Sequence, residues 1–368
     1  MPRRVPSERT GLGHRRRPPP VVLRAATKVT PAIAPLLPAP VKRLLSGRRA
    51  VIVDGNTLDP TLQFFLAGQR TLGLTGLVVD GDPVKTRAMT RESCVALGGP
   101  SAPVATQELS LPGPGGPITA RHYRPSDPGA AALLVYYHGG GFVFGDLDSF
   151  DAFCRRMCDG AGVHVLSVEY RLAPEHKAPA AVQDAEAAFR WATEHATELG
   201  ADPDRVAVGG DSAGGALAAV VSQLARDGGG PVPCLQLLLY PITDFDAQTR
   251  SRTLFGDGFL LTSSDMDFFH RQYLEGSGVA STDPRISPML ADNLAGLPPA
   301  VVVTAGFDPL RDEGNQYAAR LAAAGVPVDL REQGSMTHAF INLGGLGGGC
   351  TRSIGDIVAA LKAHLRRG

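Results

Sequence analysis

Short apolar runs alternate with helical segments from residue 133 to the end of the chain, and no other feature constrains the fold so strongly. Runs without regular polar positions are typical of strands buried on both faces, and they fall at 133–137, 163–170, 205–209, 235–240, 300–304 and 328–331. Helical segments are predicted at 180–199, 213–227, 311–324 and 353–366. This order predicts an α/β fold, in which a mostly parallel sheet carries helices on both faces.

Three segments depart from this order. A Gly- and Pro-rich turn separates the runs 107–111 and 118–123, which predicts a hairpin. Residues 51–100 are predicted to be mostly helical and irregular. Residues 241–297 hold no buried strand, although they carry several aromatic side chains. So long an interruption of a compact sheet indicates an inserted, partly helical element, whose apolar residues are placed to cover a site at the strand ends.

The charges balance over the whole chain, with 36 basic and 36 acidic residues, but not along it. Residues 1–50 hold 12 Lys and Arg and one acid, Glu8, so residues 51–368 hold 24 basic (36 − 12) and 35 acidic residues (36 − 1). The mildly acidic remainder argues against a nucleic-acid partner. The basic, Pro-rich head at 1–29 is expected to be flexible, and its charge suits peripheral association with an anionic surface.

Cellular location is predicted from the apolar stretches and the cysteines. No apolar run approaches the ~18 residues of a membrane helix, so no transmembrane segment is expected. Prolines interrupt the only apolar stretch of the head, which makes it a poor secretory signal. The five cysteines are scattered and lack the Cys/His pairs of a zinc site. Such free thiols predict a reducing, cytoplasmic location.

The sequence Gly-Asp-Ser-Ala-Gly-Gly at 210–215 joins the run 205–209 to the helix that begins near residue 213. It is a Gly-x-Ser-x-Gly motif between a strand and a helix, which is the context that this motif requires. A side chain in place of either flanking glycine would clash at so tight an elbow. The bend exposes the Ser212 hydroxyl near a helix N-terminus, which predicts that Ser212 is a nucleophile.

A second glycine motif, His-Gly-Gly-Gly-Phe at 138–142, follows the run 133–137. Acyl transfer builds negative charge on a carbonyl oxygen, and fixed donors must already point at that oxygen. Consecutive glycines let main-chain N–H groups approach it without obstruction, and Ala213, the residue after the serine, supplies a further N–H. The motif therefore predicts an oxyanion hole. His138 is expected to brace the loop rather than to act as a base.

A serine nucleophile needs a base, and the base needs an acid to orient it. Asp308 follows the fifth apolar run, and His338 lies in the loop after the sixth. The order Ser212, Asp308, His338 is expected for this architecture, and the carboxyl ends of parallel strands meet at one edge of the sheet. Asp312 and Glu313 compete for the role of the acid, but they lie about a turn into the next helix, so Asp308 is preferred.

Together these motifs resemble the hormone-sensitive-lipase-like branch of the α/β-hydrolases, also called family IV of the bacterial lipolytic enzymes. The resemblance covers roughly residues 105–368 and rests on His-Gly-Gly-Gly-Phe (138–142), Tyr-Arg-Leu-Ala-Pro-Glu (170–175), Gly-Asp-Ser-Ala-Gly-Gly (210–215), Asp-Pro-Leu (308–310) and His-Ala-Phe (338–340). It implies the α/β-hydrolase fold and a serine carboxylesterase, with Gly140, Gly141 and Ala213 as oxyanion donors.

The resemblance also implies a division of the chain into a core and a cap. The catalytic core would comprise residues 106–240 and 298–368. A mainly helical cap would be built from residues 30–105 and from the insertion 241–297.

Two further expectations rest on the same resemblance. The segment 170–175 looks structural in that family, so Arg171 receives no catalytic role. Family members often pair through their last strand and helix, here 328–366, so a homodimer is expected.

The expected reaction is hydrolysis of a small-molecule ester through an acyl-enzyme, which needs no metal or organic cofactor. Phe142, Phe144, Phe259 and Phe340 are predicted to line a compact apolar pocket, which favours short-to-medium acyl chains. An amidase or peptidase on the same fold would share every residue named, and a lipase would take longer chains. A non-catalytic ligand-binding relative would normally have lost the histidine, which this chain keeps.

Overall fold

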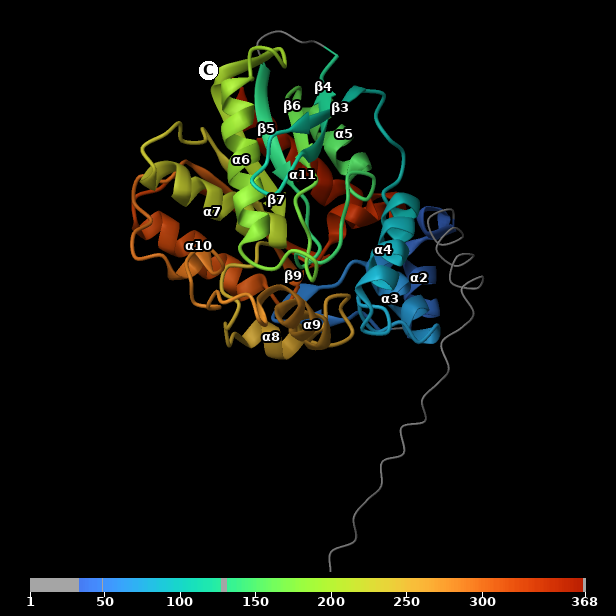
Figure 1. Cartoon of the computed structure of the whole chain (residues 1–368). Helices are drawn as coiled ribbons and strands as arrows, with labels where there is room; N and C mark the ends of the chain where they lie inside the picture. Colours follow the sequence, from blue (N-terminus) through green and yellow to red (C-terminus); the bar gives the residue numbers. More distant parts are fainter. Residues whose placement is uncertain (1–32, 48, 127–130, 367–368) are drawn as a thin grey trace, which may run out of the picture.

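The computed structural model describes residues 33–47, 49–126 and 131–366. The basic head predicted at 1–29 lies outside these described residues. Eight strands form one sheet in the order β10-β9-β8-β7-β5-β6-β4-β3 (Figure 1). They are β3 (Ala105–Leu111), β4 (Ile118–Arg124), β5 (Ala131–Tyr137), β6 (His164–Val168), β7 (Ala201–Asp211), β8 (Gln236–Leu239), β9 (Ala300–Phe307) and β10 (Val328–Thr337).

The strand pairings confirm the α/β fold with a mostly parallel sheet. The antiparallel pairs are β3 with β4, the predicted hairpin, and β4 with β6. All other neighbours run parallel, from β6 through β5, β7, β8 and β9 to β10. Their carboxyl ends therefore meet at one edge of the sheet.

Helices cover both faces of the sheet. Alternate residues of β5 separate the two layers: Leu133, Val135 and Tyr137 pack on one face and Leu134 and Tyr136 on the other, as the two-residue period of a strand requires. The first face is covered by α6 (Ala180–Glu194), α7 (Ala213–Asp227) and α10 (Arg311–Ala323), and the second by α5 (Asp151–Ala161) and α11 (Gly348–Leu365).

The structure extends several predicted elements. β10 was expected to end at Arg331 but runs to Thr337, because its pairing with β9 continues from Gln333 opposite Ala305 to Thr337 opposite Phe307 across an irregularity. This extension carries the chain directly to His338. β7 likewise continues to Asp211, so that strand and helix meet at Ser212.

Two groups of elements stand outside the strand–helix alternation of the sheet (Figure 1). The first precedes the sheet in the sequence and comprises η1 (Ala34–Leu36), α2 (Ala39–Leu45), β1 (Ile52–Val53), β2 (Asn56–Thr57), α3 (Pro60–Thr71) and α4 (Pro83–Leu97). The second interrupts it and comprises α8 (Arg250–Phe255), α9 (Ser263–Leu274) and η2 (Pro288–Leu290). Another short helix, η3 (Phe340–Leu346), follows β10.

Asp265 of α9 joins these two groups. Its carboxylate accepts hydrogen bonds from the N–H groups of Leu77, at 3.0 Å, and Val78, at 2.9 Å, in the loop between α3 and α4. The same carboxylate caps α9 by accepting from Thr262. No helix in the described ranges is both long and apolar enough to cross a membrane.

Candidate active site

Ser212 occupies the turn between β7 and α7 with φ 54° and ψ −115°. This left-handed conformation is strained for a serine, and its surroundings hold it there: the Ser212 N–H donates to the Leu239 carbonyl at 2.9 Å. A Cβ on Gly210 would collide with the main chain of Gly214, and one on Gly214 would collide with the Tyr137 carbonyl. The glycines of the motif are thus required by the closeness of three main-chain segments.

A chain of hydrogen bonds links serine, histidine and aspartate across the carboxyl ends of the strands. His338 Nε2 lies 3.0 Å from Ser212 Oγ, and His338 Nδ1 lies 2.7 Å from Asp308 Oδ2. The other oxygen of Asp308 accepts from the Leu310 N–H at 2.8 Å. The Asp308 side chain is fully buried, and its hydrogen-bond partners are the Leu310 N–H and the His338 imidazole. The geometry can therefore pass the serine proton to an imidazole that a carboxylate orients.

Asp312 and Glu313, the other carboxylates considered from the sequence, are engaged elsewhere. Asp312 accepts from the Ser251 N–H at 2.8 Å, and Glu313 forms an ion pair with Arg252 at 2.7 Å. Glu313 is fully buried, and this burial raises its pKa to about 7 although Arg252 opposes the rise. Neither carboxylate hydrogen-bonds to His338.

Free main-chain donors lie beside the serine. Within the described part of the chain, the N–H groups of Gly140 and Gly141 donate to no other residue, and both glycines line the same cavity as Ser212 and Ala213. The N–H of Ala213 belongs to the first turn of α7, where it has no helical acceptor. Three residues with such free amides thus line the cavity together with Ser212.

Aromatic contacts brace the loop that carries these amides, residues 138–145, which we call the glycine loop. The His138 ring stacks on Tyr170 with 4.3 Å between centroids, and Tyr170 Oη donates to the His138 carbonyl at 2.7 Å. Burial lowers the pKa of His138 to about 4, so the ring is neutral and its Nδ1–H donates to the Gly139 carbonyl. His138 supports the loop and does not reach Ser212.

Asp211, the residue before the serine, ties the turn at Ser212 to the glycine loop. Its buried Oδ1 accepts from the Gly139 N–H at 2.8 Å and from Tyr136 Oη at 2.7 Å. Burial raises the pKa of Asp211 to about 6, although both hydrogen bonds favour the ionised form. In the sequence, the position of Asp211 next to Ser212 is the only sign of this role.

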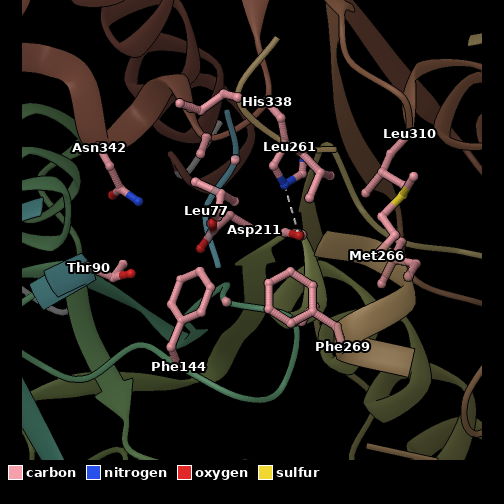
Figure 2. Close-up of a pocket in the computed structure, with 18 of the residues that line it drawn as sticks. Leu77, Thr90, Phe144, Asp211, Leu261, Met266, Phe269, Leu310, His338 and Asn342 are labelled. Atoms are coloured by element: carbon pink, nitrogen blue, oxygen red, sulfur yellow. Dashed lines mark hydrogen bonds between the residues drawn. The ribbon is translucent and has the colours of Figure 1, made fainter. Parts of the chain in front are cut away.

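A cavity of about 1030 Å³ opens above Ser212 and His338. Its wall combines residues of α3, α4 and the glycine loop with residues of the 241–297 segment and of η3. Phe144 and Phe269 lie side by side in its wall (Figure 2), in edge-to-face contact with their ring centroids 5.6 Å apart. A Cβ on Gly141 would strike the Phe269 ring, so this glycine lets α9 close over the loop.

The four phenylalanines predicted to line the pocket divide into two pairs. Phe142 and Phe144 lie in the cavity wall. Phe259 and Phe340 do not line it, which corrects the expectation for them: the Phe259 ring packs on Phe307, and the fully buried Phe340 ring packs on Tyr240. The sequence positions of Phe259 and Phe340 do not indicate in which direction each ring points.

Side chains that sequence reasoning missed complete the cavity wall. Some are apolar and come from the insertion, and others are polar and come from α3, α4 and η3; they include Gln69, Thr90, Ser93, Leu261, Met266, Phe269 and Asn342. Asn342 follows His338 by one turn and could have been suspected on that ground. In the described residues no cluster of three or more His, Cys, Asp or Glu is arranged to hold a metal ion.

Comparison with known proteins agrees with this geometry. A family model described as alpha/beta hydrolase fold matches residues 134–342, more than half of the chain. Carboxylic ester hydrolase LipN of Mycobacterium tuberculosis is 60% identical over 340 residues, which are 91% of this chain and 90% of that protein. Esterase LipI of the same organism is 44% identical over 261 residues, which are 70% of this chain and 82% of that protein.

Solved structures give the same result. The structure of an ester hydrolase from the metagenome of Lake Arreo, EH1AB1, superposes with a TM-score of 0.78 at 38% identity, covering 83% of this chain and 99% of that chain. An esterase of the archaeon Pyrobaculum calidifontis gives a TM-score of 0.77 at 38% identity, covering 83% and 98%. The chain therefore belongs to the α/β-hydrolase fold family, in the hormone-sensitive-lipase-like branch that its motifs resemble.

Proposed function

We propose that this protein is a carboxylesterase that cleaves carboxylic esters through an acyl-enzyme on Ser212. One observation carries the proposal: the Asp308–His338–Ser212 chain, with 2.7 and 3.0 Å between its polar atoms, ends beside three free amides in the wall of one cavity. That combination supplies a nucleophile, a base and an oxyanion site for acyl transfer. The relatives named as carboxylic ester hydrolase and esterase support the same activity.

Each side chain has a defined part in the proposed cycle. Ser212 Oγ attacks the ester carbonyl carbon while His338 Nε2 takes its proton, and Asp308 stabilises the imidazolium that forms. The carbonyl oxygen becomes an oxyanion and accepts from the N–H groups of Gly140, Gly141 and Ala213.

The cycle closes by two proton transfers through the same imidazole. His338 returns the proton to the leaving alcohol oxygen, which leaves the acyl group on Ser212. Water then gives a proton to His338 and attacks the acyl carbon, the proton passes to Ser212 Oγ, and the acid departs.

We also propose that residues 30–105 and 241–297 act together as a cap over the site. The hydrogen bonds from Leu77 and Val78 to Asp265 support this, because they join the two segments above the cavity. The Phe269 ring of the cap meets the Phe144 ring of the glycine loop edge-on, which narrows the cavity and favours short-to-medium acyl chains. Faster turnover of a palmitate than of a butyrate ester would contradict this preference.

Two finer proposals concern the protein as a whole. A homodimer through β10 and α11 is supported by the edge position of β10 and by Leu330 on it, which is 40% exposed. Light scattering that shows only monomers would reject the dimer. A cytoplasmic location is supported by five free cysteines, and recovery of the protein outside the cytoplasmic fraction would reject it.

The test of the proposed activity compares Ser212→Ala with the wild type on 4-nitrophenyl butyrate. We expect kcat to fall by about 10⁴- to 10⁶-fold, because the variant keeps the fold and loses the nucleophile. Ser101→Ala is the matched control, since Ser101 is exposed in a loop before β3. A phosphonate ester should also label the wild type at Ser212, detected by mass spectrometry. Wild-type activity in Ser212→Ala would reject the mechanism.

A further inference from the structure

Helix α9 directs two aromatic side chains of one face toward the glycine loop. Phe269 and Tyr273 are four residues apart, which places them on the same side of the helix. The Phe269 ring meets the Phe144 ring edge-on, and it occupies the space that a Cβ on Gly141 would need. The Tyr273 ring lies one turn further along α9 and stacks on Phe142. One face of this helix thus covers the second half of the glycine loop.

The stack between Phe142 and Tyr273 is close and nearly parallel. The two ring centroids are 4.0 Å apart, and the angle between the ring planes is 4°. The Phe245 ring extends the stack, with its centroid 6.0 Å from that of Phe142 and 6.2 Å from that of Tyr273. Phe142 and Tyr273 are both buried, so the contact between their rings excludes water.

Phe142 depends on such a contact because its main chain is strained. Its φ of 62° lies in the left-handed region, where a bulky residue is an outlier. A conformation of this kind persists only where the surrounding structure holds it. Gly141, directly before it, has φ 60° and carries one of the free amides of the proposed oxyanion hole. Relaxation of the main chain at Phe142 would therefore change the direction of the Gly141 N–H.

The two stacked residues are also attached to one segment of main chain. The Phe142 carbonyl accepts from the Ala173 N–H at 2.8 Å, and the Tyr273 carbonyl accepts from the Ala178 N–H at 3.0 Å. The segment 173–178 therefore holds the glycine loop on one side and the last turn of α9 on the other. Because both main chains are held in this way, the Tyr273 ring has a defined position against Phe142.

The Tyr273 hydroxyl takes no part in this arrangement. Tyr273 Oη is buried, and no residue of the described chain hydrogen-bonds to it. Tyr170, the other tyrosine beside the glycine loop, differs, because its hydroxyl donates to the His138 carbonyl. A hydroxyl without a partner contributes no hydrogen bond to the folded state. The ring of Tyr273, and not its hydroxyl, is what supports the loop.

We propose that Tyr273 is a positioning residue for the oxyanion hole: its ring holds Phe142 in the left-handed conformation that directs the free amides of the glycine loop toward the ester carbonyl oxygen. This inference rests on the proposed carboxylesterase function and adds a residue of α9 to it. Tyr273 is not among the described residues that line the cavity, whereas Phe142 is. Tyr273 thus acts through Phe142 and touches no substrate.

The experiment compares Tyr273→Leu and Tyr273→Phe on 4-nitrophenyl butyrate. Leucine fills the core but offers no ring face. We therefore expect kcat to fall about 10- to 100-fold with KM changed less than about threefold, because misplaced amides weaken the transition state more than the bound ester. Phenylalanine keeps the ring and loses only a hydroxyl without a partner, so kcat should stay within about twofold of the wild type.

Phe189→Leu is the matched control for loss of an aromatic ring from the core. Phe189 is a buried residue of α6 in the same hydrophobic layer as Phe142 and Tyr273, and it is not part of the described cavity wall. We expect this variant to lose stability in urea unfolding and to keep kcat. If Tyr273→Leu does not fold, Tyr273→Met replaces it, because the flexible methionine side chain refills a core more easily.

Inhibition by a trifluoromethyl ketone gives a second measurement, one that reports on the oxyanion itself. Ser212 Oγ bonds to the carbonyl carbon of 1,1,1-trifluoro-2-hexanone while His338 takes the serine proton, and the C=O double bond opens to an oxyanion. The inhibition constant should rise in Tyr273→Leu by about the factor by which kcat/KM falls, as for a transition-state analogue. It should not change in Phe189→Leu.

The outcomes separate this inference from the activity on which it rests. Wild-type kcat in Tyr273→Leu overturns it, and so does an equal loss of kcat in Tyr273→Leu and Phe189→Leu. A loss in Tyr273→Phe as large as in Tyr273→Leu overturns the role of the ring, and an unchanged inhibition constant overturns the link to the oxyanion hole. All of these leave the carboxylesterase intact. If the wild type hydrolyses no ester, the proposed function fails as well.

Discussion

Asp211 lies between the proposed nucleophile and the proposed oxyanion donors, and it accepts from a main-chain N–H of the glycine loop and from Tyr136. Both donors are buried with it, so no water replaces a lost bond. Its carboxyl is also costly to ionise there, since burial raises its pKa to about 6. One side chain thus fixes the distance between Ser212 and the amides that follow Gly139.

Two replacements of Asp211 distinguish the effect of its hydrogen bonds on stability and activity from the effect of its charge. Asp211→Ala leaves Tyr136 Oη and the Gly139 N–H without an acceptor, so we expect a loss of about 2–4 kcal/mol in the free energy of unfolding. The displaced glycine loop should lower kcat about 10- to 100-fold. Asp211→Asn keeps an acceptor oxygen and should recover most of both quantities. Urea unfolding and kcat on 4-nitrophenyl butyrate measure them, and equal losses in the two variants would contradict this role.

Helix α4 is fastened to the glycine loop by Arg87. Its guanidinium donates to the carbonyls of Val143 and Ala173, each at 2.8 Å, and pairs with Glu175 at 2.6 Å. The hydrogen bonds from Arg87 lower the pKa of Glu175 to about 2. Val143 belongs to the glycine loop, so the proposed cap and the proposed oxyanion site share this contact.

Arg87→Met tests whether that contact positions the loop. We expect kcat to fall about tenfold or more with KM changed less, because the amides lose their alignment while the cavity keeps its wall. Lys85→Met is the control: Lys85 lies two residues before Arg87 on α4 and pairs with Asp80 and Asp82, away from the glycine loop. A loss of activity that is the same in both variants would show a general effect of charge removal.

The strands and the order of the motifs could be predicted from the sequence, because each depends on neighbouring residues. A buried parallel strand is a continuous apolar run, and a strand–Gly-x-Ser-x-Gly–helix turn is local chemistry. The C-terminal end of β10 could not be predicted, since its last residues are polar and are held by pairing with β9.

Contacts between distant segments left no signal in the sequence. Arg252 and Glu313 are 61 residues apart, and nothing in either neighbourhood indicates that they meet. The direction of a ring is equally invisible, which is why Phe142 lies in the cavity wall while Phe340 lies beneath it. The cavity wall that α3, α4 and η3 form together was missed for the same reason, because η3 is far from α3 and α4 in the sequence.

A buried ion pair links the 241–297 segment to helix α10 and makes the free energy of unfolding depend on pH. Glu313 of α10 is buried and pairs with Arg252 of α8, and burial raises its pKa from an ordinary value of 4.5 to about 7. The native state therefore binds a proton that the unfolded state releases between these values. The stability that this group contributes is fully present below pH 4.5 and is lost as the pH rises through 7.

Arg252→Met should make the free energy of unfolding depend more strongly on pH. Without the guanidinium, the folded-state pKa of Glu313 rises further, so the buried carboxylate destabilises the variant most at high pH. We expect a loss of about 3–5 kcal/mol in the free energy of unfolding at pH 8.5, the usual effect of breaking a buried pair. At pH 5.5 the loss should be clearly smaller, because Glu313 is then protonated.

Urea unfolding at both pH values measures the difference, and Arg252→Met/Glu313→Gln, which has no carboxylate to titrate, should remove it. Equal losses at the two pH values in Arg252→Met would mean that Arg252 acts through packing and its bonds to the Asp244 and Phe245 carbonyls, and not through the charge of Glu313.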